Sequence, residues 1–148
     1  MTITTTTHLN FRGRAAEALE LYRGVFGGDV TAVTYAQAGA VTDPAEADQV
    51  MWGQVASVSG FQVMAYDVPA GRPLEPGVAP YFVSVRGDDA EELAGYWDGL
   101  TAPDAGATVV VPLAPAGWAP LYGMVTDRFG VTWVLDVTAP GTWSQQTP

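Results

Sequence analysis

Few side chains in this chain could perform chemistry, and His8 is the one histidine among them. Cysteine is absent, which excludes disulfides and thiolate chemistry, and every basic residue is an arginine. Neither a Gly-rich phosphate loop nor a Gly-x-Ser-x-Gly nucleophile elbow occurs. An imidazole with an ordinary pKa near 6.5 can act as a general acid–base, so His8 is the one weak catalytic candidate. The alternative is a hydrogen-bonded histidine in the wall of a cavity.

The elements around His8 follow from the spacing of apolar residues. Alternating polar and apolar side chains over Thr4–Phe11 predict a strand with one buried face. Apolar residues at three- and four-residue spacing over Arg14–Phe26 predict a helix, and Gly27 and Gly28 provide its left-handed stop.

The chain repeats itself after half its length. Phe11–Tyr22 and Val85–Tyr96 are identical at six of twelve positions, and Trp52–Val55 matches Tyr122–Val125 further on. Each copy has the pattern of a strand, a helix and three strands, so the sequence predicts an α+β fold of two βαβββ modules. The later strands are expected at Val30–Tyr35, Gln49–Ser57, Phe61–Val68, Thr108–Leu113, Leu121–Thr126 and Val131–Val137.

The predicted boundaries follow the proline- and glycine-containing stretches. We expect a single 148-residue domain with module one over about 1–68, a linker over 69–79, module two over about 80–138 and a loosely held tail over 139–148. A loop is predicted at Ala114–Pro120, and it carries Trp118.

The final hairpin of each module predicts which side chains share a face. A type I turn with a bulge at Asp127–Gly130 places Tyr122 opposite Asp136 and Met124 opposite Val134. The same register in the first copy, together with the opening strands, gives a non-helix face of aromatic, thioether, amide and hydroxyl groups that suits a small-molecule pocket. The predicted ligand-binding residues are His8, Asn10, Trp52, Gln54, Gln62, Met64, Tyr66, Phe82, Ser84, Trp118, Tyr122, Met124, Val134 and Asp136. The alternative is that these side chains only fill space between the sheets.

Composition limits the partners. The net charge of −10 leaves no basic patch for nucleic acid, and the chain contains no apolar stretch long enough to cross a membrane. The amino terminus lacks the features of a secretory signal, so cytoplasmic residence is expected. The acidity indicates solubility or, alternatively, attraction of cationic ligands, for which Asp136 is the candidate residue, free to pair with such a ligand or with His8.

The segments HLNFRGRAAEALELYRGVFG (8–27) and YGMVTDRFGVTWVLDV (122–137) resemble the PhnB-like branch of the glyoxalase/bleomycin resistance/dioxygenase superfamily, the vicinal oxygen chelate proteins. The resemblance implies a cupped, pseudo-two-fold mixed sheet around a cavity, helices outside, and often a homodimer. Metal-using members place one ligand on each of four strands. The matching positions here are His8, Met64, Phe82 and Val134. Such a set cannot hold a transition metal, which needs three or four N or O donors, so we expect no metal, no cofactor and no metal-dependent activity.

Three hypotheses remain open. The leading one is a metal-independent protein that binds or sequesters a small, partly aromatic or cationic organic molecule. The second is an enzyme of lyase or isomerase type that uses His8 as general acid–base, together with Asp136 or Tyr122. The third is a dimeric interaction protein whose cavity is filled by its own side chains.

Overall fold

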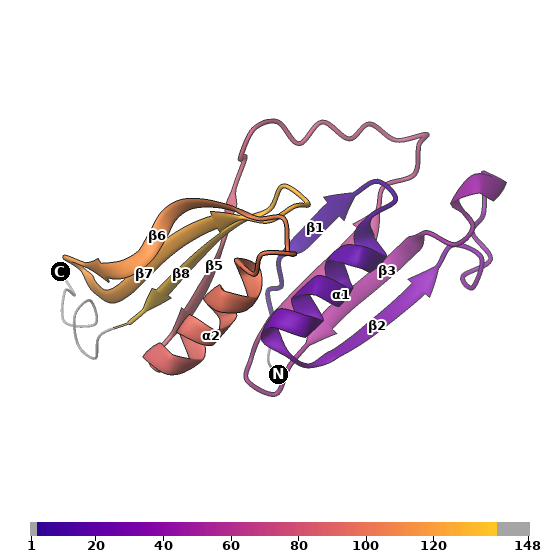
Figure 1. Cartoon of the computed structure of the whole chain (residues 1–148). Coiled ribbons are helices and arrows are strands. Elements are labelled where there is room, and N and C mark those ends of the chain that lie inside the picture. Colours follow the sequence, from indigo (N-terminus) through magenta and orange to yellow (C-terminus); the bar gives the residue numbers. More distant parts are fainter. Residues whose placement is uncertain (1–2, 139–148) are drawn as a thin grey trace. The chain divides into compact units, whose positions relative to one another are not determined.

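The computed structural model describes residues 3–138, which form two compact units that divide between Pro76 and Gly77. Each unit carries one α-helix on a four-stranded sheet (Figure 1). The order β-α-β-β-β occurs twice, so the predicted α+β class with two βαβββ modules is confirmed. The predicted loose tail lies outside the described residues. Within the described range, both α-helices lack the length and apolar character that a membrane-spanning helix requires.

The first unit has a mixed sheet in the order β1-β4-β3-β2. Strand β1 runs parallel to β4, and the other neighbours are antiparallel. A short 3-10 helix, η1, lies within the long connection between β2 and β3. The elements are β1 (His8–Phe11), α1 (Ala15–Phe26), β2 (Asp29–Thr34), η1 (Pro44–Glu46), β3 (Val50–Ala56) and β4 (Gln62–Asp67).

Helix α1 packs against this sheet through a stripe of buried side chains with helical spacing. Its contacts with β3 are close because Gly53 lies under the helix: a Cβ atom at this position would be 2.6 Å from Cδ1 of Leu19. The amino terminus of α1 has no side-chain cap from Arg14, and the buried carboxylate of Asp67 instead accepts a hydrogen bond from the Ala15 amide at 3.0 Å. The end of β4 therefore fixes the start of α1.

The second unit repeats this topology in the order β5-β8-β7-β6. Its helix starts at Asp89, whose carboxylate accepts hydrogen bonds from two amides of the first turn. Gly123 makes the close contact here, because an added Cβ would lie 2.8 Å from Cζ3 of Trp97. The elements are β5 (Phe82–Gly87), α2 (Ala90–Leu100), β6 (Thr108–Ala116), β7 (Ala119–Thr126) and β8 (Thr132–Val137).

Two local predictions were wrong. The first strand begins at His8 rather than Thr4, and the expected loop at Ala114–Pro120 is a tight hairpin in which β6 continues to Ala116 and β7 begins at Ala119. The prolines of this segment suggested a loop, but β6 is an edge strand with several register shifts, and proline is tolerated at such positions. Trp118 therefore lies at the tip of a hairpin.

The hairpin between β7 and β8 is organised by Asp127. This buried carboxylate accepts hydrogen bonds from the amides of Phe129 and Val131 through Oδ1, and from the indole Nε1 of Trp133 through Oδ2 at 2.9 Å. Trp133 is fully buried. The sequence TDRFGVTW (126–133), which contributed to the family resemblance, is thus a structural motif that closes a turn and anchors a core tryptophan.

Candidate functional site

The non-helix face of the first sheet brings together the predicted residues of module one. Gln54 pairs with Met64 and Ala56 with Gln62, as the register predicted for the hairpin of the first copy requires. The parallel pairing of β1 with β4 also places His8 opposite Met64 and Asn10 opposite Tyr66. The predicted pairing of Trp52 with Tyr66 falls outside the residues over which β3 and β4 are paired. These side chains are exposed or half-buried, whereas Leu9, Val55, Val63 and Ala65, which point the opposite way, are fully buried.

His8 has a defined orientation on this face. Its Nδ1 lies 3.2 Å from Oδ1 of Asn10, and its ring meets the ring of Tyr66 edge-on with 5.1 Å between the centroids. Oδ1 of Asn10 can therefore accept a hydrogen bond from Nδ1–H, and in this tautomer Nε2 is the unprotonated ring nitrogen. The predicted wall histidine and the predicted acid–base are both compatible with this geometry.

The second sheet brings together Tyr122, Met124, Val134 and Asp136 in the predicted register, with Ser84 opposite Val134 and Phe82 opposite Thr132. Trp118 joins them through an edge-on contact with Tyr122, with 5.3 Å between the ring centroids.

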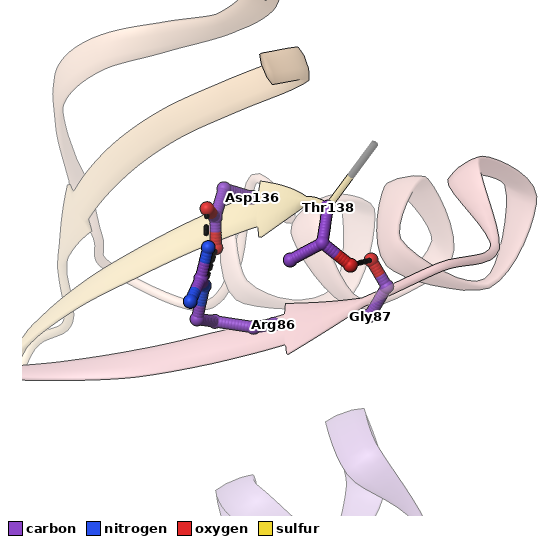
Figure 2. Close-up of polar contacts among 4 residues, drawn as sticks. All are labelled: Arg86, Gly87, Asp136 and Thr138. Atoms are coloured by element: carbon purple, nitrogen blue, oxygen red, sulfur yellow. Dashed lines mark hydrogen bonds and ion pairs between the residues drawn. The ribbon is translucent and has the colours of Figure 1, made fainter. Parts of the chain in front are cut away.

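Asp136 is engaged by a residue that the sequence analysis did not include in the site. Arg86 lies opposite Asp136 on the neighbouring strand, and its Nε is 3.1 Å from Oδ1 and 3.2 Å from Oδ2 of the carboxylate (Figure 2). The side chain of Asp136 is 13% exposed and that of Arg86 57%. The carboxylate that was expected to pair with His8 or with a cationic ligand is therefore neutralised within its own sheet.

The donor set on these faces does not fit the metal of the metal-using relatives. His8 pairs directly with Met64, and the corresponding positions of the second sheet carry Phe82 and Val134. Within residues 3–138, no three His, Cys, Asp or Glu side chains gather into a group that could hold a metal ion.

A partly open pocket of about 550 Å³ lies at one end of the first sheet, entirely within the first unit. Of the predicted site residues only Tyr66 contributes to it. The pocket combines aromatic, thioether and small apolar groups with three hydroxyls and a guanidinium, and it is lined by Tyr35, Ala40, Thr42, Met51, Tyr66, Pro69, Gly71 and Arg72. Its volume lies in the range typical of small-molecule sites, about 300–1,000 Å³.

A β-bulge in β3 turns Met51 toward this pocket. Val33 pairs with Trp52 and the next residue of β2, Thr34, pairs with Val50, so Met51 is the extra residue of the ladder. Val50 is buried and lies beside Gly53 on the sheet face that contacts the helix. In a regular strand, residues on one face are separated by an even number of positions, but these two are separated by three. The bulge thus reverses the alternation of side chains before it, and Met51 lines the pocket instead of packing under the helix.

Contacts from remote parts of the unit hold the pocket walls. Arg12 donates to the carbonyl oxygens of Pro69 at 3.5 Å and Arg72 at 2.8 Å, and the Ala70 amide donates to the carboxylate of Glu46 at 2.9 Å. The Pro69–Arg72 turn is therefore fixed from two sides.

The buried Tyr35 supports the floor of the pocket. Its hydroxyl donates to the carbonyl oxygen of Asp67 at 2.7 Å. Burial raises the pKa of Tyr35 above its ordinary value of 10.0, and the charge of Arg72 acts in the opposite direction. Tyr35 is thus a neutral hydrogen-bond donor at physiological pH.

Sequence reasoning missed Arg86 and every pocket residue except Tyr66. Arg86 could have been found, since it continues the alternation of Phe82 and Ser84 along one strand. Tyr35, Met51 and Arg72 could not, because a bulge and a turn held by distant side chains place them.

Comparisons with known proteins agree with this architecture. The family model for the glyoxalase/bleomycin resistance protein/dioxygenase superfamily matches residues 7–135. Protein PA1353 from Pseudomonas aeruginosa is similar at 30% identity and a TM-score of 0.77, over 93% of this chain and 98% of that one. Among curated proteins, none matches the sequence.

Two more distant solved structures share the fold. A protein from Bacillus cereus, described as a putative 3-demethylubiquinone-9 3-methyltransferase and PhnB protein, is 20% identical, with a TM-score of 0.65 over 92% of this chain and 100% of that one. A glyoxalase/bleomycin resistance protein/dioxygenase from Nocardioides is 16% identical, with a TM-score of 0.58 over 100% of this chain and 92% of that one.

Proposed function

The chain belongs to the glyoxalase/bleomycin resistance protein/dioxygenase superfamily, and from this premise we propose that it binds a small organic molecule without a metal. The pocket at the end of the first sheet carries the proposal, because its size and its mixture of apolar walls with a few polar groups are those of a small-molecule site. The unsuitable donor set at His8, Met64, Phe82 and Val134 supports the metal-independent part. Sequestration or resistance is the role that we infer for such binding.

The experiment combines native mass spectrometry of the purified protein with a thermal-shift screen of aromatic and glycopeptide antibiotics and other small organic molecules. We expect a bound or stabilising compound, and an unchanged response after dialysis against EDTA. The Ala40→Phe variant, which places a ring in the pocket, should lose the response, while Gly95→Ala on an open helix surface should keep it. Loss of binding on removal of a stoichiometric transition metal would contradict the proposal, as would a screen without any shift.

The orientation of His8 favours a second candidate function, an enzyme with His8 as general acid–base. The contacts with Asn10 and Tyr66 hold its ring beside the pocket that Tyr66 lines. If a substrate emerges from the screen, His8→Gln should abolish turnover while ligand binding and the melting temperature stay close to those of the wild type. Retained turnover would exclude this role.

The cellular setting of the proposed function also stays a prediction. We infer a homodimer that resides in the cytoplasm and has no nucleic-acid partner, in line with the family resemblance and the net charge of −10. Light scattering on the purified protein and cell fractionation test these two points. That the remaining predicted site residues take part in ligand binding is likewise part of the proposal, and alanine variants of Trp52 and Tyr122 test it.

A further inference from the structure

Three polar groups of the pocket in the first unit can donate hydrogen bonds and have no partner among the described residues, whereas the Tyr35 hydroxyl is already bonded to the Asp67 carbonyl. The guanidinium of Arg72 and the hydroxyls of Thr42 and Tyr66 take part in no hydrogen bond or ion pair within the described part of the chain. Around them lie the thioether of Met51 and the rings of Tyr35 and Pro69. Such a lining fits a ligand with an apolar body and an end that accepts several hydrogen bonds.

We propose that this pocket binds an organic anion, an aromatic or otherwise apolar body with a carboxylate, and that Arg72 pairs with the carboxylate. The inference rests on the proposed small-molecule function and names its ligand class. A carboxylate accepts bonds only, so it can satisfy the guanidinium and both hydroxyls at once. A cationic ligand would instead place its positive charge beside that of Arg72.

The acidic side chains near the pocket are committed to backbone amides. Glu46 accepts the Ala70 amide, and the buried Asp67 accepts the amides of Ala15 and Val50 at 3.0 and 2.9 Å. Neither carboxylate pairs with Arg72. Within the described residues the guanidinium of Arg72 therefore has no carboxylate in direct ion-pair contact, although the whole chain carries a net charge of −10.

Arg72 is also positioned before any ligand arrives. Its carbonyl oxygen accepts a bond from Arg12 at 2.8 Å, and its amide donates to the carbonyl of Pro69 at 2.9 Å. Because the turn that carries it is already ordered, binding has to immobilise only the side chain, which lowers the entropic cost.

The test uses three probes that share a naphthyl ring, are similar in size and differ in charge: 2-naphthoate, 2-naphthamide and 2-naphthylmethylamine, titrated at pH 7 by isothermal titration calorimetry. We expect 2-naphthoate to bind about 10-fold or more tightly than the other two, as a charge-assisted hydrogen bond predicts. In Arg72→Gln this preference should disappear, and in Arg72→Lys it should fall to an intermediate value because the charge remains and the planar fork is lost. Arg23→Gln removes the same charge from the surface of α1, where Arg23 pairs with Glu20, and should leave the preference intact.

A second measurement locates the bound probe. With methionine methyl groups labelled with carbon-13, 2-naphthoate should shift the NMR signal of Met51 more than that of Met124, which lies in the second unit. Equal affinity for the three probes, preference for the amine, no binding of 2-naphthoate, or a preference that survives in a folded Arg72→Gln variant would each overturn the inference. The proposed small-molecule function would still be decided separately by the native mass spectra and the broad screen.

Discussion

Replacement of Asp127 by Asn should destabilise the protein through one identifiable contact. The Asn carbonyl can still accept hydrogen bonds from the amides of Phe129 and Val131, but its NH2 group would face the Nε1–H donor of Trp133, so the hydrogen bond from Nε1 to Oδ2 would be lost. A hydrogen bond to a charged group contributes about 1.5–3 kcal/mol, and a buried unsatisfied donor costs about 1–3 kcal/mol. Because Trp133 is fully buried, we expect the free energy of unfolding to fall by about 2–3 kcal/mol.

A double-mutant cycle with Trp133→Phe isolates that contact. The Phe variant removes the indole donor, so Asp127→Asn should cost less than about 1 kcal/mol in its background, and the coupling energy should exceed about 1 kcal/mol. Urea unfolding followed by circular dichroism measures each free energy. Asp88→Asn, which removes the same charge from an exposed position, is the control and should change stability by less than about 0.5 kcal/mol. Additive single variants would refute the assignment of this contact.

Two further predictions test the packing and the floor of the pocket. Gly123→Ala in β7 should lower the free energy of unfolding by about 1–3 kcal/mol, because the new methyl group would overlap the ring of Trp97 on α2. Gly95→Ala, in open space on α2, should be neutral or stabilising, and thermal unfolding of both variants distinguishes the two cases. The raised pKa of Tyr35 means that the folded state favours the neutral phenol, so the stability that Tyr35 contributes is fully present below pH 10 and is lost as the pH rises through the folded-state pKa. Tyr35→Phe should remove this part of the stability loss at alkaline pH. At pH 7 the same variant should cost about 1 kcal/mol, because the hydrogen bond to the Asp67 carbonyl is lost. Urea unfolding across pH 7–11.5 measures both effects, and an unchanged loss of stability at alkaline pH would contradict the assignment.

The sequence was sufficient to predict the structure wherever that structure depends on residues close together in the chain. The turn at Asp127–Gly130 fixed the register of β7 and β8, and this register placed Met124 opposite Val134 as observed. The helix positions followed from apolar spacing in the same way. The hairpin at Trp118 was missed because the prolines before it are usually loop signals, and only the edge position of β6 makes them acceptable in a strand.

The pocket residues could not be predicted from local sequence patterns, because contacts between distant parts of the chain place them. Arg72 is placed by Arg12, some sixty residues earlier in the chain, and Tyr35 by a carbonyl of Asp67. No spacing rule connects such residues, because their contacts exist only after the sheet has formed. The pairing of Asp136 with Arg86 is a different case, because Arg86 continues the alternation of Phe82 and Ser84 along β5 and this pattern could have indicated the contact.

The bulge at Met51 has a consequence for how residues are compared between this protein and its relatives. An extra residue in a strand reverses the face of every residue before it, so Val50 is a core residue although simple alternation from Gln54 would turn it toward the ligand side. A relative without the bulge would present a different set of side chains at the same aligned positions. If binding residues in this strand are assigned from an alignment alone, core residues will therefore be mistaken for pocket residues and pocket residues for core. The insertion or loss of one strand residue can thus change which side chains meet a ligand, even where the aligned residues are the same.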